Sequence, residues 1–273
     1  MRAHRTLIVS LIMALALAIP ASASASRILI DGSTSMLPLV QKLAAAYHKE
    51  FPKIQAPKVG GGQTAVGISD AAAGRVDIGM ASRDPIEGVD PEGLEFIKIA
   101  RDGVCVITNP HNPLANLSQE TVQEIFTGTI RNWSQVPGAH TTGPIDLFDR
   151  DGASGTQDAF QNIFLGENVQ ISHSATAESS EGLEVNAVGS DKNAIGFTSF
   201  AATVNGGVHT VDYQGVPCTL RNAKSGQYGG VRNFWFVTKG APTGETRKFI
   251  NWVIKRHNTK VEAIISSEWI SIH

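Results

Sequence analysis

Two short segments rich in hydroxyl-bearing and glycine residues contain the side chains best suited to chemistry in this chain. Their members are Ser33, Thr34 and Ser35 in the first segment and Arg150, Ser154, Gly155 and Thr156 in the second. Hydroxyls and free backbone N–H groups at the start of a helix donate hydrogen bonds, and the helix dipole favours negative charge there. A planar guanidinium can hold two oxygens of one anion. The pattern predicts capture of a small oxyanion, whereas each segment alone is also explained by a helix-capping serine, with a surface arginine in the second.

Two further turns in the first half of the chain could add donors to the same site. One contains Gly62, Gln63 and Thr64, and the other contains Ser82 and Arg83. The glycine run superficially suggests a nucleotide-binding loop, but it lacks the lysine that such loops place on the phosphates, so we exclude that interpretation. Arg83 offers a second guanidinium, and its alternative role is a solvated ion pair with Asp84.

These segments are expected to be positioned by strands that alternate with helices. Periodicity predicts strands at 27–30, 76–80, 95–99, 104–108, 145–148, 195–197 and 234–237, and helices ending at 48 and spanning 66–74, 118–126, 154–164 and 246–257. Such alternation is typical of an α/β protein with a mostly parallel sheet and helices on both of its faces.

The chain is long enough to divide into two lobes, because a mature chain of roughly 250 residues approaches the size at which single cores stop growing. The segment Asn109–Pro113 resists both helix and sheet, and we place the first crossing between the lobes there. The strand at 234–237 is expected to return to the first lobe. We therefore predict one lobe from 26–108 and 234–273 and another from 109–233, with the helices after Ser33 and Ser154 opening onto one cleft.

The first residues predict export. Arg2 and Arg5 precede a short apolar run, which ends before the small-residue stretch 21–26. This arrangement is typical of a secretory signal peptide, which we place at residues 1–25, with cleavage after Ala23 or Ala25. The run is shorter than a membrane-spanning helix, and no cysteine at the junction offers a lipid attachment site. We expect a freely soluble periplasmic protein.

Composition excludes some partners. The formal net charge is −2 and the basic residues are scattered, which argues against nucleic acid as a partner. His48, His173 and His209 stand singly, so we expect neither a metal site nor a cofactor. In an oxidising compartment Cys105 and Cys218 could pair, but Cys105 lies in an apolar run. We interpret it as a small buried hydrophobe, with a disulfide as the alternative.

Several of these motifs, in this order, resemble the phosphate-binding proteins of phosphate-specific ABC importers. They are Gly-Ser-Thr-Ser at 32–35, the glycine-rich turn at 60–64, Val-Asp-Ile-Gly-Met-Ala-Ser-Arg at 76–83 and Arg-x-x-x-Ser-Gly-Thr at 150–156. Further matches are 124–128 with Asn132-Trp133, 193–197 and 225–228. The resemblance extends along nearly the whole mature chain.

The resemblance implies a type II periplasmic-binding-protein fold, in which two α/β lobes with mixed, mostly parallel sheets are joined by a two-strand hinge. It implies that inorganic phosphate is enclosed between the lobes by hydrogen bonds and is passed to the membrane permease subunits of an ABC importer by a monomeric receptor. In that scheme the hydroxyl and glycine segments described above form the two walls. The family's best-known members have an acidic residue where this chain has Arg83, so either Asp31, Asp84 or Asp151 accepts the proton of the ligand or discrimination rests on another group.

Three other functions remain open at this stage. The same pocket could bind sulfate, molybdate or another tetrahedral oxyanion in place of phosphate. Ser154 near an arginine could serve a phosphate-ester hydrolase, although such an enzyme needs a base beside the nucleophile or a metal ion. A signalling or adhesion protein could reuse the fold.

Overall fold

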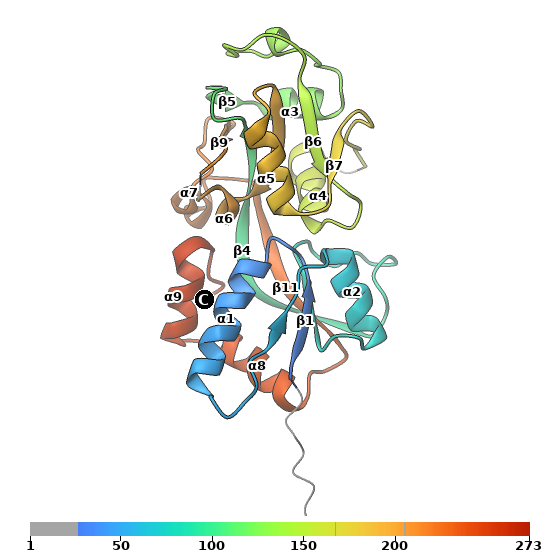
Figure 1. Cartoon of the computed structure of the whole chain (residues 1–273), viewed down its shortest axis with the longest axis vertical. Helices are drawn as coiled ribbons and strands as arrows, with labels where there is room; N and C mark the ends of the chain where they lie inside the picture. Colours follow the sequence, from blue (N-terminus) through green and yellow to red (C-terminus); the bar gives the residue numbers. More distant parts are fainter. Residues whose placement is uncertain (1–26, 167, 205) are drawn as a thin grey trace, which may run out of the picture.

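The computed structural model describes residues 27–166, 168–204 and 206–273. The predicted signal peptide at 1–25 lies outside the described residues. The chain forms two α/β lobes that are joined by two long neighbouring strands, β4 and β11 (Figure 1). Across the described ranges, no helix is long and apolar enough to cross a membrane.

The lower lobe in Figure 1 contains both ends of the described chain. Its elements are β1 (Leu29–Gly32), α1 (Leu37–Glu50), β2 (Lys58–Val59), α2 (Thr64–Ala73), β3 (Ile78–Ala81), most of β4 (Leu94–Thr108) and β11 (Val231–Lys239), α8 (Gly244–Ile254) and α9 (Thr259–Glu268). Helix α1 buries Leu39, Val40, Leu43 and Tyr47 on one face, as its 3.6-residue spacing predicts. The expected closing helix is confirmed as α8, whereas α9 was not predicted.

The upper lobe is built from the middle of the chain (Figure 1). Its elements are β5 (Asn116–Leu117), α3 (Gln119–Phe126), a 3-10 turn (Trp133–Gln135), β6 (Asp146–Arg150), α4 (Gly155–Phe160) with a π-helical continuation (Gln161–Leu165), β7 (Thr176–Glu178), α5 (Glu181–Ser190), β8 (Ala194–Ser199), α6 (Phe200–Thr203), β9 (His209–Thr210), β10 (Asp212–Tyr213) and α7 (Leu220–Ser225). The two predicted strand–turn–helix units are therefore present, as β1 to α1 and as β6 to α4.

One mixed sheet runs through both lobes in the order β2-β1-β3-β11-β4-β8-β6-β7. Its two ends are parallel, because β1 pairs in parallel with β2 and β3, and β6 does so with β7 and β8. Its centre is antiparallel, because β11 and β8 both run opposite to β4. The carboxyl ends of β1 and β6 therefore lie near the junction of the lobes.

Strand β4 differs from the prediction of two strands at 95–99 and 104–108. It is one strand of 15 residues, which pairs with β11 up to Gly103 and with β8 from Val104 onward. The polar triplet between the predicted strands resembles a turn in sequence, but Asp102 is buried and bonded to Arg232 opposite it. The crossing predicted at Asn109–Pro113 lies beyond this strand, and the pairing favours a change of lobe within β4.

Two apolar clusters mark where each lobe has its core. The cluster of the upper lobe includes Val104 and Ile107 of β4, whereas the cluster of the lower lobe includes Ile99, Phe234 and Phe236. We therefore propose that the outgoing boundary lies near Gly103 instead of after Thr108. The proposed return boundary stays before Phe234.

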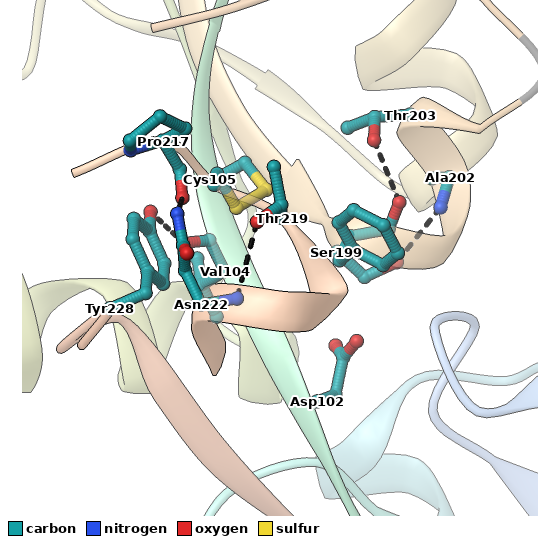
Figure 2. The surroundings of a disulfide bond; sticks show 12 residues. Asp102, Val104, Cys105, Ser199, Ala202, Thr203, Pro217, Thr219, Asn222 and Tyr228 are labelled. Carbon is teal, nitrogen blue, oxygen red and sulfur yellow. Dashed lines mark hydrogen bonds between the residues drawn. A yellow bond between two sulfur atoms is a disulfide. The ribbon is translucent and has the colours of Figure 1, made fainter. Parts of the chain in front are cut away.

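Cys105 and Cys218 form a disulfide, with their Cα atoms 5.7 Å apart (Figure 2). Cys105 is fully buried as expected, but the alternative of a disulfide holds in place of an unpaired buried thiol. The bond holds the segment before α7 against β4, and Tyr228 reinforces this contact by donating a hydrogen bond of 2.7 Å to the Val104 carbonyl (Figure 2). The bond therefore fastens the segment before α7 to the part of β4 that has entered the upper lobe.

Candidate functional site

The first wall of the candidate site is the turn between β1 and α1. Ser33 and Ser35 are 3% and 1% exposed, and their hydroxyl oxygens lie 2.9 Å apart. Helix α1 has Met36 at its N-cap and no side-chain cap, so Ser33 does not serve as the capping residue considered as its alternative role. One of the two hydroxyls donates its hydrogen to the other, so the pair keeps one hydroxyl hydrogen for another group.

The two predicted turns of the same lobe meet behind this wall. The Thr64 hydroxyl lies 3.2 Å from the Ser82 hydroxyl and accepts a hydrogen bond from the Ser82 backbone N–H. Both residues are buried. Gly62 is held differently, since its N–H donates to an Asp31 carboxylate oxygen that also accepts from Gly32. Thr64 and Ser82 thus add hydroxyls to the site, whereas the backbone N–H of Gly62 holds its turn against Asp31.

The opposite wall begins at Arg150, the last residue of β6. This side chain is 1% exposed, and its Nε donates to the Glu178 carbonyl at 2.9 Å. Its Nη2 lies 3.4 Å from the Thr34 hydroxyl of the other lobe. Its Nη1 has no hydrogen-bond partner among the described residues. A buried guanidinium nitrogen without a partner is costly, so this atom is a candidate donor for an anion.

Helix α4 starts at Gly155, shortly after this arginine, and its first turn packs against the lower lobe. A Cβ atom added at Gly155 would lie 2.5 Å from the Thr64 hydroxyl and 2.8 Å from the Ser82 hydroxyl, so glycine permits this approach. The Ala65 N–H also donates to the Ala153 carbonyl across the lobes at 3.0 Å. Ser154 caps α4 by accepting from the Gln157 N–H, which leaves its hydroxyl hydrogen available. The start of α4 therefore lies against the start of α2, and Arg150 connects the same wall to the turn before α1 through Thr34.

Arg83 is engaged through its guanidinium by carboxylates of the protein beside the predicted site. Its guanidinium forms a bidentate pair with Asp90 at 2.6 and 2.9 Å, and its Nε contacts Asp158 of α4 at 2.9 Å. The third partner is the backbone carbonyl of Asp84 and not its carboxylate. The guanidinium of Arg83 thus links the two lobes beside the site, because carboxylates on both sides bind it more strongly than a hydroxyl pocket would.

Gln63 also acts across the junction and not as a free donor. Its side-chain amide donates to the Asp151 carboxylate at 2.7 Å. Asp151 accepts from the Ala153 N–H as well, and Asp84 accepts from Asn233 and Trp235. The three carboxylates proposed to accept a ligand proton, Asp31, Asp84 and Asp151, are therefore all engaged by protein donors.

Sequence reasoning missed a buried charged group behind Thr156. Arg232 of β11 donates to Asp102 of β4 at 2.8 and 3.1 Å, and its Nη1 donates to the Thr156 hydroxyl at 2.7 Å. Burial raises the pKa of Asp102 to about 7, although Arg232 opposes this shift. No local pattern signals this role, because a lone charged residue within a strand usually faces solvent.

Two buried glutamates of α5 complete the surroundings of Arg150. Glu184 is fully buried with one oxygen 3.9 Å from Arg150 Nε, and burial raises its pKa well above the usual range. The backbone N–H of Glu181 donates to the Thr34 hydroxyl, and its carboxylate accepts from the Ser199 N–H. Both glutamates accept a backbone N–H of β8, so α5 supports this side of the site.

The arrangement suits binding of an oxyanion better than catalysis. Hydroxyls and one guanidinium donate hydrogen bonds, whereas His48 and His209 contact backbone carbonyls elsewhere. Within the residues that the structure describes, no group of three or more His, Cys, Asp or Glu side chains could hold a metal ion. A nucleophile paired with a base does not emerge from these contacts.

Comparison with known proteins gives consistent matches. The family model described as the PBP superfamily domain matches residues 19–257. The phosphate-binding protein PstS of Bacillus subtilis is 27% identical over 226 residues, which cover 82% of this chain and 74% of the relative.

Two solved structures extend this likeness to three dimensions. A protein from Clostridium perfringens, described as a phosphate ABC transporter substrate-binding protein with bound phosphate, is 30% identical with a TM-score of 0.84. That match covers 91% of this chain and all of the other. An ABC-type phosphate transport receptor from Vibrio cholerae is 28% identical with a TM-score of 0.70, over 89% of this chain and 99% of the other.

Proposed function

Because this chain belongs to the family of the PBP superfamily domain, we propose that it captures inorganic phosphate between its two lobes and delivers it to an ABC importer. The type II periplasmic-binding-protein fold expected from the sequence is confirmed by the similarity to the Clostridium perfringens structure. The function of that protein and of the Bacillus subtilis relative supports phosphate as the ligand. The proposed receptor is a monomer that binds without turnover in the periplasm and then meets the permease subunits.

The observation that carries this proposal is the buried guanidinium of Arg150 at the junction of the lobes. One of its nitrogens contacts Thr34 of the opposite lobe, and another has no partner within the described part of the chain. The proposed phosphate contacts are the hydroxyls and amides around it, namely Ser33, Thr34, Ser35, Thr64, Ser82, Ser154, Gly155 and Thr156, together with Arg150 itself. Gly62, Gln63 and Arg83 shape and close this site without touching the ligand.

An anion that contacts both walls binds the closed arrangement more tightly than an open one, and so shifts the lobes toward closure. Closure is also supported by contacts between protein groups, of which the 2.7 Å bond from Gln63 to Asp151 is one. Phosphate release to the importer then requires these contacts to separate.

A related oxyanion is the second candidate ligand. A carboxylate acceptor favours phosphate because it binds the ligand's proton and repels fully deprotonated sulfate. Here Asp31, Asp84 and Asp151 are bonded to protein donors, and Arg83 is paired with Asp90 and Asp158. We therefore expect weaker discrimination against sulfate than such a carboxylate would provide.

Calorimetric titration tests the proposal. The mature protein is titrated with phosphate, arsenate, sulfate and molybdate, and a chromogenic phosphate ester is offered in parallel. Saturable phosphate binding without ester hydrolysis supports the receptor, whereas hydrolysis or tighter binding of another oxyanion contradicts it.

Arg150→Ala tests the site itself. We expect phosphate binding to weaken by about 1.5–3 kcal/mol, or roughly 10- to 150-fold, because a hydrogen bond to a charged group is lost. Arg75→Ala is the control, since its side chain is 60% exposed and pairs with Asp70 on the surface. Normal phosphate affinity in the Arg150 variant would show that the site is assigned wrongly.

A further inference from the structure

The two strands that join the lobes contain a buried ion pair. Arg232 of β11 lies directly opposite Asp102 of β4 in the antiparallel register. Their side chains are 2% and 0% exposed, and Arg232 Nη2 lies 2.8 Å from an Asp102 oxygen. Removing one partner of such a pair leaves an uncompensated buried charge, so the two residues act as a unit.

The same arginine reaches the proposed phosphate site. Its Nε and Nη2 donate to one oxygen of Asp102, and its Nη1 donates to the Thr156 hydroxyl at 2.7 Å. The guanidinium is planar and rigid, so holding one side of it on Asp102 fixes the direction of the other side. Thr156 follows Gly155 in the first turn of α4, which is pressed against Thr64 and Ser82.

The hydrogen of the Thr156 hydroxyl is then directed away from Arg232. A threonine hydroxyl has one hydrogen to donate, and an arginine has no acceptor. No acceptor for this hydrogen is recorded among residues 27–166, 168–204 and 206–273. Thr156 is 2% exposed, so water is an unfavourable alternative partner. An oxygen of the bound anion is the group that can accept it.

We propose that Arg232, held by Asp102, is a positioning residue of the phosphate site that orients the Thr156 hydroxyl toward the bound anion. This inference rests on the proposed function. It also connects the hinge to the site, because both members of the ion pair lie on the strands that join the lobes. A change in the register or twist of β4 against β11 would move the donor that fixes Thr156.

A double-mutant cycle tests whether Arg232 acts through Thr156. The perturbing change is the combined D102N and R232Q variant, which removes both charges and so leaves no unpaired ion in the core. It is made in three backgrounds: native Thr156, Thr156→Ser, which keeps the hydroxyl, and Thr156→Val, which removes it. Phosphate affinity is measured by calorimetry or by tryptophan fluorescence up to millimolar phosphate.

We expect the combined change to weaken phosphate binding about tenfold with native Thr156 and with Thr156→Ser. With Thr156→Val we expect less than about a twofold loss, because the hydroxyl that Arg232 orients is gone. An equal loss in the valine background would overturn the inference, since Arg232 would then act directly on the anion or through the fold. An unchanged affinity with native Thr156 would overturn it as well.

Folding is controlled by measuring the free energy of unfolding of each variant without phosphate. If the combined variant does not fold, Arg232→Lys takes its place in the same cycle, because lysine keeps the charge opposite Asp102 but lacks the fork that reaches Thr156. Failure of the native protein to bind phosphate would contradict the proposed function and this inference together. Normal native binding with no coupling to Thr156 contradicts this inference alone.

Discussion

The ion pair between Arg83 and Asp158 is expected to stabilise the closed arrangement of the lobes. Asp158 lies on α4 of the upper lobe, and Arg83 follows β3 of the lower lobe. Their N···O distance is 2.9 Å, and the side chains are 8% and 33% exposed. When the lobes separate, Asp158 returns to water while Arg83 keeps Asp90. Asp158→Asn should therefore destabilise the closed state selectively.

The magnitude follows from the geometry. A hydrogen bond to a charged group contributes about 1.5–3 kcal/mol, and the partial exposure of Asp158 and screening by salt place this pair near or below the lower limit. A loss of about 1–1.5 kcal/mol raises the dissociation constant for phosphate about 5- to 12-fold. Because the pair forms on closure, most of this change should appear as faster phosphate release.

Stopped-flow fluorescence and calorimetry measure the two quantities. Glu50→Gln is the matched control, because Glu50 pairs with Lys260 at the same 2.9 Å distance but within one lobe. The difference between Asp158→Asn and the native protein should also shrink as ionic strength rises. A release rate and an affinity within twofold of the native values would refute the assignment of this pair to closure.

Three further outcomes are expected from other parts of the structure. Gly155→Ala should abolish most phosphate binding, because the added Cβ would lie 2.5 Å from the Thr64 hydroxyl of the other lobe. Gly152→Ala is the control and should bind phosphate normally, because its added Cβ would meet no atom within 4 Å. Calorimetry compares the two variants, and equal affinities would contradict the contact between the lobes. The disulfide between Cys105 and Cys218 joins residues 113 positions apart, so replacing both cysteines with serine should lower the free energy of unfolding by about 2–4 kcal/mol. Free thiols detected after the unmodified protein is denatured without a reducing agent would contradict the pairing. Because burial raises the pKa of Asp102 from 3.8 to about 7, the folded state holds a proton that the unfolded state releases, and stability without phosphate should fall as pH rises through this window. Denaturant titrations between about pH 4 and 8 should show a flatter profile for the combined D102N and R232Q variant, and identical profiles would contradict the shift.

The amino-acid sequence by itself determined the local parts of the site. Ser33, Arg150 and Ser154 were recognisable because a strand, a turn and a helix follow one another within a few residues, and local propensity specifies such units. The same local rules predicted α1, α3, α4 and β11 near their observed positions. The same units led us to predict that the helix starts after Ser33 and Ser154 would face one cleft, and Arg150 does contact Thr34 of the opposite lobe at 3.4 Å.

The tertiary structure alone decided how charges and thiols pair. Arg83 was expected to bind the ligand, but it pairs with Asp90 and Asp158. Asp90 is close to Arg83 in the sequence, whereas Asp158 belongs to the other lobe. Asp102 lay between two predicted strands, and Cys105 was interpreted as a small buried hydrophobe. Their partners became visible only where β11 and the segment before α7 pack against β4. A hydrogen bond or ion pair forms only where folding brings two groups within about 3 Å, and a disulfide forms only where two sulfurs come into bonding range. Residues far apart in the sequence meet this condition through tertiary packing, and the local sequence does not encode it.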